Sequence, residues 1–160
     1  MVTISVGLAE IKFSKTLGDL IVVHGLGSCV GVAIYDKVSR LGGMAHIVLP
    51  DSSIQRDNQV PERFADTGVP LLLHKFKDLG GNMMTSFVKI VGGANMFARA
   101  NISSLDIGKR NIEAVLQTLL ALGIRPLAQD CGGTNGRIFS LHISTGQVFS
   151  RRIGMQEKEL

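Results

Sequence analysis

Two side chains near the start of this sequence are the nucleophile and the base that a thiol hydrolase needs. Cys29 lies in the stretch HGLGSCVGVAIYD (24–36), and His46 lies in GGMAHIVLP (42–50). The thiolate attacks a carbonyl carbon whereas the neutral thiol does not, so a catalytic cysteine requires a base, and histidine is the residue most often used. The pair therefore indicates acyl transfer through a covalent thioester.

The spacing of Cys29 and His46 suits a β-hairpin that brings both to one face. If the hairpin turns around Lys37 and Val38, residue 29 pairs with residue 46; if it turns one residue later, residue 29 pairs with residue 48 and lies diagonal to 46. In either register the two Cβ atoms are about 5 to 8 Å apart on one face. A turn centred on Val38 would place them on opposite faces. Two alternatives stay open: Cys29 as a small buried hydrophobe and His46 as a core histidine bonded to backbone.

The glycines before Cys29 predict a sharp bend at the start of a strand. Gly25 and Gly27 permit backbone conformations that other residues avoid, and they allow another segment to approach closely. At such a bend the N–H groups of Ser28 and Cys29 are free to point outward. Two backbone donors beside a nucleophilic sulfur can stabilise the oxyanion of a tetrahedral intermediate.

The other histidines are weaker candidates. His24 is expected to be an exposed turn residue, His74 a surface residue of a helix, and His142 a strand residue without an acidic or cysteine neighbour. No HExxH or CxxC spacing indicates zinc, and GLGSCVG does not have the glycine spacing of a dinucleotide-binding loop. We therefore predict no metal and no cofactor.

The composition is that of a globular protein with no low-complexity segment. Residues 1–160 are expected to form a single domain, since 160 residues are about the size of one domain. The formal net charge is +4, but the seventeen basic residues are scattered. Nucleic-acid binding, which needs a basic patch, is therefore not expected. No secretory signal and no apolar run long enough to cross a membrane is visible, so we expect a cytoplasmic protein without membrane insertion and with free cysteines.

The elements expected around the two candidate residues are mostly strands. Apolar runs and alternation predict strands at 2–10, 18–25, 29–36, 42–50, 86–94 and 124–130, and a closing hairpin from residue 137. Helices are expected within 66–79, with Asp66 or Thr67 as N-cap and Pro70 in the first turn, and at 107–123. Neighbouring strands outnumber strand–helix–strand crossovers, which favours an α/β fold with a mixed, largely antiparallel sheet.

Several separated motifs resemble those of a known family. GLGSCVGVAIYD, GGMAHIVLPDS, RFADTGVPLLL, KIVGGANMF, IGKRNIEAV and CGGTNGRI occur in the order and spacing of the bacterial chemotaxis family CheD, the chemoreceptor glutamine deamidases. The similarity extends over most of the chain. It implies a single-domain, three-layer α/β sandwich and cysteine-dependent hydrolysis of particular glutamine side chains in methyl-accepting chemoreceptors. Receptor methyl esters are chemically similar acyl donors, so their hydrolysis is expected as a second reaction. Cys29 falls on the family's nucleophile and His46 on its histidine.

The sequence departs from the family pattern at two positions. The family has a threonine as third catalytic residue where this chain has Val23, so a backbone carbonyl, such as that of Val23, has to orient the imidazole instead. The family's DTGG is Asp130-Cys131-Gly132-Gly133 here. Cys131 is thus expected to replace a threonine in a turn and not to act as the nucleophile.

The resemblance also suggests partners and a rival function. The polar loop at 51–64 and the segment GGANMF, with Met96 and Phe97, are candidates for docking a receptor helix near Gly27; the alternative for that segment is ordinary packing. The missing hydroxyl at Val23 favours a rival interpretation. In that interpretation the protein is an adaptor with weak or lost deamidase activity that binds a CheC-type phosphatase, as members of the family do.

Overall fold

The computed structural model of the protein describes residues 1–54, 60–98 and 106–160. Residues 55–59, part of the loop considered above for docking, lie outside the described residues. The elements, in chain order, are β1 (Thr3–Ser5), β2 (Ile11–Ser14), β3 (Leu20–Leu26), β4 (Val30–Asp36), β5 (Gly42–Ile47), η1 (Ser52–Ile54), η2 (Pro61–Arg63), α1 (Ala65–Asp78), η3 (Met83–Thr85), β6 (Ser86–Gly92), α2 (Ile107–Ala121), β7 (Ala128–Cys131), β8 (Arg137–His142), β9 (Val148–Arg152) and β10 (Glu157–Glu159).

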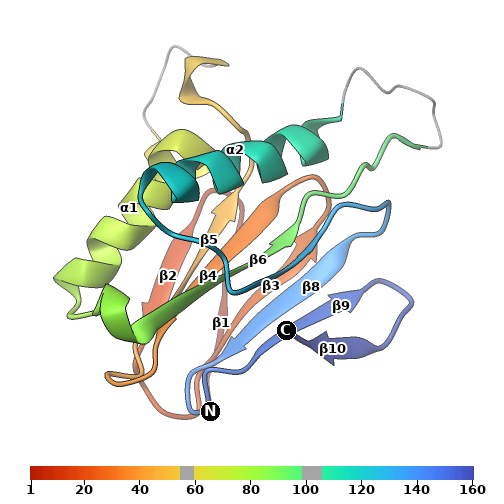
Figure 1. Cartoon of the computed structure of the whole chain (residues 1–160). Helices are drawn as coiled ribbons and strands as arrows, with labels where there is room; N and C mark the ends of the chain where they lie inside the picture. Colours follow the sequence, from red (N-terminus) through yellow and green to blue (C-terminus); the bar gives the residue numbers. More distant parts are fainter. Residues whose placement is uncertain (55–59, 99–105) are drawn as a thin grey trace.

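These elements form three layers, one of helices and two of strands (Figure 1). One sheet has the order β1-β3-β8-β9-β10, and the other has the order β2-β5-β4-β6-β7. In the described strands the β1–β3 and β6–β7 pairs are parallel and the remaining pairs are antiparallel. The predicted three-layer α/β sandwich with mixed, largely antiparallel strands is confirmed. The strands are divided between two sheets, which the sequence did not indicate.

The two faces of β4 explain why it lies in the middle of the molecule. Every residue of β4 is buried, so neither face of this strand meets water. Val30, Val32 and Ile34 pack in the cluster that contains α1 and α2, whereas Ala33 and Tyr35 pack in the cluster between the two sheets. Each large side chain buried in this way contributes about 1.5–3 kcal/mol. Cys29, directly before β4, belongs to the cluster between the sheets.

A glycine in β4 allows the sheet that contains β8 to pack closely against β4. Gly31 has no side chain, and a Cβ atom there would lie 2.5 Å from Cδ1 of Phe139 on β8. The Phe139 ring thus fills the space that a β4 side chain would occupy, which is the close packing typical of protein interiors. A larger residue at position 31 would push the sheets apart beside the candidate site.

Some predicted elements are wrong in extent. The strand expected at 2–10 is shorter (β1), and β2 was not predicted; the strand expected at 124–130 is β7, which begins at residue 128; and β10 was missed. The first helix begins at Ala65 with Phe64 as N-cap, so Pro70 lies inside α1 and not in its first turn. Asp66 does not cap the helix, because its carboxylate accepts hydrogen bonds from the Ser52 N–H (2.9 Å) and hydroxyl (2.7 Å). A competing tertiary contact thus displaces the expected cap.

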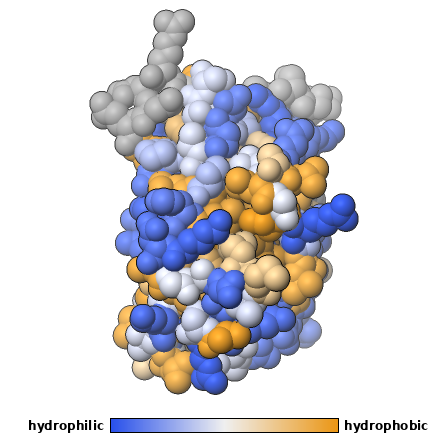
Figure 2. Space-filling view, turned by 60° about the vertical axis from the view of Figure 1, so that its left-hand side comes forward, coloured by the Kyte–Doolittle hydropathy of each residue, from blue (hydrophilic) through white to orange (hydrophobic). Residues whose placement is uncertain are grey.

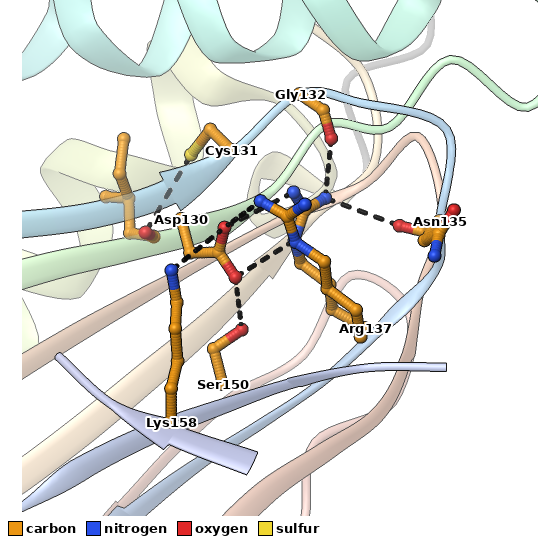
Figure 3. A network of polar contacts seen from close by, with 9 residues as sticks. Asp130, Cys131, Gly132, Asn135, Arg137, Ser150 and Lys158 are labelled. Atoms are coloured by element: carbon orange, nitrogen blue, oxygen red, sulfur yellow. Dashed lines mark hydrogen bonds and ion pairs between the residues drawn. The ribbon is translucent and has the colours of Figure 1, made fainter. Parts of the chain in front are cut away.

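A buried polar network joins the two sheets at β7, β8 and β9 (Figure 3). The Asp130 carboxylate is contacted by Arg137, whose Nε lies 3.3 Å from Oδ2, and by Arg152, whose guanidinium donates at 2.9 Å to Oδ1. The Ser150 hydroxyl donates to Asp130 at 2.8 Å. These contacts outweigh burial and hold the pKa of Asp130 well below its usual range. Arg137 also donates to the Gly132 carbonyl at 2.7 Å, which fixes the loop after β7.

Arg137→Met is expected to lower the free energy of unfolding by about 3 kcal/mol, the lower end of the range for breaking a buried ion pair. Asp130 would keep Arg152 and Ser150 but lose its fully buried partner. Urea denaturation followed by circular dichroism measures the change. Arg152→Met is the matched control, since this side chain is 40% exposed and its loss is expected to cost less than about 1 kcal/mol. Equal effects of the two substitutions would contradict the prediction.

Candidate active site

Cys29 lies on the bend that connects β3 to β4, and the bend is fastened by the segment after β6. The N–H of Gly93 donates to the Cys29 carbonyl at 2.8 Å, and that of Ala94 donates to the Gly27 carbonyl at 2.9 Å. Gly92 has a φ of +121°, and a Cβ atom on it would collide with the Cys29 carbonyl oxygen. Residue 92 must therefore be glycine for the two segments to approach so closely.

The register of the β4–β5 hairpin puts Cys29 and His46 on the same face. Gly31 pairs with His46 and Val30 pairs with Ile47, so residue 29, one position before β4, lies opposite residue 48 and diagonal to 46. This is the second of the two registers considered from the sequence, and the turn centred on Val38 is excluded. Both side chains point toward the layer between the two sheets, where diagonal neighbours are about 7–8 Å apart at Cα.

The hydrogen bonds of His46 determine which ring nitrogen carries the proton. Nδ1 lies 3.2 Å from the Val6 carbonyl oxygen, which can only accept, so Nδ1 is the protonated nitrogen. Nε2 is buried and has no hydrogen-bond partner in the described part of the chain. The ring therefore presents an unprotonated nitrogen that is free to take a proton.

The turn between β1 and β2 holds the acceptor for His46 in place. The Glu10 carboxylate accepts a hydrogen bond from the Gly7 N–H at 2.7 Å, which closes the turn. The backbone of His46 is tied to the same turn, since its N–H donates to the Glu10 carbonyl at 3.0 Å and its carbonyl accepts from the Ala9 N–H at 3.1 Å. The imidazole and its acceptor thus belong to one hydrogen-bonded unit.

The structure corrects the expected acceptor: it is the carbonyl of Val6 and not that of Val23. Val23 is fully buried on β3 in the cluster between the sheets that also contains Cys29. Its backbone pairs with Phe139 of β8. A valine there supplies apolar packing near the site where the family pattern has a hydroxyl.

Burial keeps both residues neutral at rest. Cys29 is 9% exposed and His46 is 3% exposed. Burial raises the pKa of the Cys29 thiol, and the N–H of Cys29 itself opposes this only in part. Burial lowers the pKa of His46, although the carbonyls of Val6 and Gly7 and the charge of Glu10 act in the other direction. An uncharged thiol beside an uncharged imidazole is the arrangement in which the imidazole acts as a general base.

Two backbone donors near Cys29 are available. Within residues 1–54, 60–98 and 106–160, neither the Ser28 N–H nor the Cys29 N–H donates to a backbone carbonyl. The N–H of Cys29 is directed at its own sulfur closely enough to lower the thiol pKa. A backbone N–H that bonds no carbonyl and lies beside a nucleophile is what an oxyanion site requires.

The predicted docking residues lie next to the glycine bend. Met96 is in contact with Gly27, where a Cβ atom would lie 3.3 Å from Cγ of Met96. The side chains of Met96 and Phe97 are nevertheless 53% and 47% exposed. Met96 thus offers an exposed apolar side chain at the glycine bend, and exposed Phe97 follows it in the chain.

The other candidate residues are not brought to this site. His24 is exposed at the end of β3, His74 pairs with Asp78 on the surface of α1 at 3.3 Å, and His142 packs edge-on against Phe149. Burial raises the pKa of the Cys131 thiol to about 11, and its sulfur lies 3.8 Å from the Ile90 carbonyl. The described residues contain no cluster of histidine, cysteine and acidic side chains that could hold a metal ion. None of their helices is long and apolar enough to cross a membrane.

A groove of about 570 Å³ opens elsewhere, between α1, the start of β6 and the end of α2. The face that bears α1 shows hydrophobic side chains bordered by hydrophilic ones (Figure 2). The residues that line the groove include Leu73, Phe87 and Ile124. Because Ser86 pairs with Asp36 at the far end of β4, this groove is at the opposite end of the strand from Cys29 and is not part of the candidate site.

Sequence reasoning missed three residues of the site: Val6, Glu10 and Asn111. The first two lie on a short turn with no motif of its own. Asn111 is fully buried on α2, and its side-chain amide donates at 2.9 Å to both the Ser28 and the Val48 carbonyls. The sequence offered one signal for Asn111, a polar residue directly before the apolar stripe of the helix. A buried side-chain amide normally forms hydrogen bonds with other buried polar groups.

Comparison with known proteins identifies the family of this chain. Residues 48–152 match the model of the family described as CheD chemotactic sensory transduction. That match begins after Cys29 and His46, whereas the relatives described next align over nearly the whole chain. Among solved structures, the hypothetical protein YfiH of Bacillus licheniformis has a TM-score of 0.47 and 14% identity over 76% of this chain and 49% of its own, so this chain spans about half its length.

Three relatives bear the name "Probable chemoreceptor glutamine deamidase CheD". The one from Symbiobacterium thermophilum is 44% identical over 98% of this chain and 96% of its own. That from Desulforamulus reducens is 44% identical over 94% and 91% of the two chains, and that from Clostridium botulinum is 41% identical over 98% and 97%. The family model matches most of this chain, and these relatives are similar to it from end to end. The chain therefore belongs to the CheD family.

Proposed function

We propose that this protein is a cytoplasmic chemoreceptor glutamine deamidase, a single domain spanning residues 1–160 in which Cys29 is the nucleophile and His46 the general base. The observation that carries the proposal is the state of His46. Its Nδ1 proton is held by Val6, its buried Nε2 is unpaired, and the strand register puts it diagonal to Cys29. The name shared by the relatives supplies the substrate class, glutamine side chains of chemoreceptors.

The first half of the reaction forms a thioester. His46 Nε2 takes the Cys29 proton as the sulfur attacks the side-chain carbonyl carbon of a receptor glutamine, and the carbonyl π electrons move to oxygen. The N–H groups of Ser28 and Cys29 stabilise this oxyanion. When the carbonyl reforms, the C–N bond breaks and the nitrogen takes the proton from Nε2, so ammonia leaves.

The second half releases glutamate. A water molecule gives a proton to Nε2 while its oxygen attacks the thioester carbon, and the C–S bond then breaks. The sulfur recovers the proton from Nε2, which restores the neutral pair. Receptor methyl esters are acyl donors of the same kind, and we propose them as a second substrate, with methanol as the leaving group.

The pH dependence follows from the His46 pKa. Only the unprotonated ring can act as base, so kcat/KM rises with pH as free His46 loses its proton. Because burial lowers that pKa, the midpoint of the acidic limb is expected below about pH 6.5, the ordinary value for histidine. Glu10→Gln is expected to move the midpoint lower still, since the Glu10 charge raises the His46 pKa. A midpoint above the ordinary value, or no shift in the variant, would contradict this assignment.

The direct test is conversion of a receptor fragment. Incubation of the purified protein with the cytoplasmic fragment of a chemoreceptor should release ammonia and convert specific glutamines to glutamate, which peptide mass spectrometry detects. Absence of both products with fragments that carry such glutamines would overturn the proposed function.

Val23 favours a second candidate function, an adaptor that binds a CheC-type phosphatase with weak deamidase activity. Val23 is fully buried and has no hydroxyl at the position where the family pattern has a threonine. The Val6 carbonyl supplies the acceptor that the imidazole needs, which is why we place the enzyme first. Val23→Thr separates the two: a large gain in deamidation would favour the adaptor, and a small change would favour the enzyme.

A further inference from the structure

We propose that Asn111 is a positioning residue that holds the Cys29 N–H in the orientation needed for the oxyanion. The inference rests on the proposed deamidase function. Asn111 lies on α2, and the helices cover one face of the sheet that contains β4 (Figure 1). Cys29 packs in the cluster on the other face of that sheet, between the two sheets. The Asn111 side chain is fully buried, so it would act through backbone and not by touching substrate.

The amide of Asn111 bridges the two strands of the catalytic pair. One N–H of its Nδ2 donates to the Ser28 carbonyl and the other donates to the Val48 carbonyl, both at 2.9 Å. Ser28 directly precedes Cys29, and Val48 lies two residues after His46 and opposite Cys29 in register. Both N–H donors of the Asn111 amide are thus used where the segments that contain Cys29 and His46 lie side by side.

The orientation of the amide is determined by its surroundings. Both neighbours are carbonyl oxygens, which only accept, so nitrogen and not oxygen must face them. The Oδ1 atom is consequently left buried without a partner in the described structure. An orphaned buried acceptor costs free energy. A hydrophobic residue at this position would avoid that cost, but it would leave the Ser28 and Val48 carbonyls without these two donors.

Holding the Ser28 carbonyl fixes the oxyanion donor. The Ser28 C=O and the Cys29 N–H belong to one planar trans peptide and point in opposite directions. When Asn111 holds the carbonyl toward α2, the N–H is turned away from the helix, and the hydrogen bond to the carbonyl also polarises the peptide and strengthens the N–H as a donor. The flanking carbonyls of Gly27 and Cys29 are held by the backbone of Ala94 and Gly93. Asn111 binds the carbonyl between these two, that of Ser28, so all three carbonyls of the bend accept a hydrogen bond.

The test uses Asn111→Leu, which keeps the approximate size and removes both donors. We expect kcat for receptor deamidation to fall on the order of 10²-fold, the lower range for loss of one oxyanion donor, with KM unchanged. Alkylation of Cys29 by iodoacetamide passes through no oxyanion, so its rate should stay at the wild-type value. A purely structural role would not separate these two readouts.

Val115→Ala is the matched control, because Val115 is also fully buried, one turn further along α2. It should destabilise the helix packing and leave kcat and alkylation unchanged. If Asn111→Leu does not fold, Asn111→Ala is measured in the same way. The inference is overturned if kcat of the folded variant equals that of Val115→Ala, or if alkylation falls in parallel with kcat. The deamidase proposal itself fails only if the wild-type protein does not deamidate.

Discussion

Cys29→Ala is expected to abolish receptor deamidation, with a loss on the order of 10⁴-fold or more in kcat. The substitution removes the atom that forms the thioester, and the other cysteine, Cys131, packs against the other hydrophobic cluster, the one that contains the helices. Ammonia release and the glutamine-to-glutamate change in a receptor fragment measure the loss. Because Cys29 contributes a small buried side chain, the variant should fold as the wild type does.

Cys131→Ala is the matched control for this result. Cys131 has a half-buried thiol whose pKa is raised to about 11, so little of it is thiolate at neutral pH, and its sulfur contacts a backbone carbonyl. The control is expected to keep wild-type activity. Activity that survives Cys29→Ala and disappears in Cys131→Ala would transfer the nucleophile to Cys131 and refute the assignment.

His46→Gln is expected to lower kcat on the order of 10³-fold, within the range for loss of a general acid–base group. Glutamine can still donate a hydrogen bond toward the Val6 carbonyl, but it has no basic nitrogen to take the thiol proton. The acidic limb of the pH profile should disappear with the imidazole. Steady-state kinetics across pH, with melting followed by circular dichroism, separate this effect from a loss of fold.

His142→Gln provides the comparison for His46→Gln. His142 also lies on a strand, but it packs against Phe149 at the other end of β8 from the candidate site. Its replacement should leave both kcat and the pH profile unchanged. A residual activity of His46→Gln close to that of His142→Gln would mean that another group deprotonates Cys29.

Short-range patterns predicted the central part of the fold well. The β4–β5 hairpin, β6 and α2 are where apolar runs, glycine stops and a helical stripe placed them. The edges were predicted poorly. β2 and β10 are short strands in which no residue is fully buried, so they carry little hydrophobic pattern, and pairing with a neighbour determines them. The cap of α1 failed for a similar reason, because Ser52 binds the carboxylate that was expected to cap.

The candidate pair could be found from the sequence because one hairpin contains it. In a hairpin the register follows from the position of the turn, so only a few pairings of residues 29 and 46 exist, and two of them put both side chains on one face. The structure has one of those two. The roles of Cys29 and His46 remain predictions, and the substitutions above test them.

The sequence by itself determined the nucleophile and base candidates, the bend before Cys29 and the class of fold, because each depends on residues close together in the chain. The backbone conformations expected of the two glycines were wrong: neither Gly25 nor Gly27 has a positive φ, and Gly25 lies within β3 with no atom close to where its Cβ would be. Only the tertiary structure decided what surrounds the candidate pair. The acceptor for His46 comes from Val6, forty positions away, and the donor to Ser28 comes from Asn111, eighty-three positions away. Backbone carbonyls and buried amides of this kind have no sequence signature. Any residue can provide a carbonyl, and the order of the strands in the sheets determines which carbonyl lies beside the site.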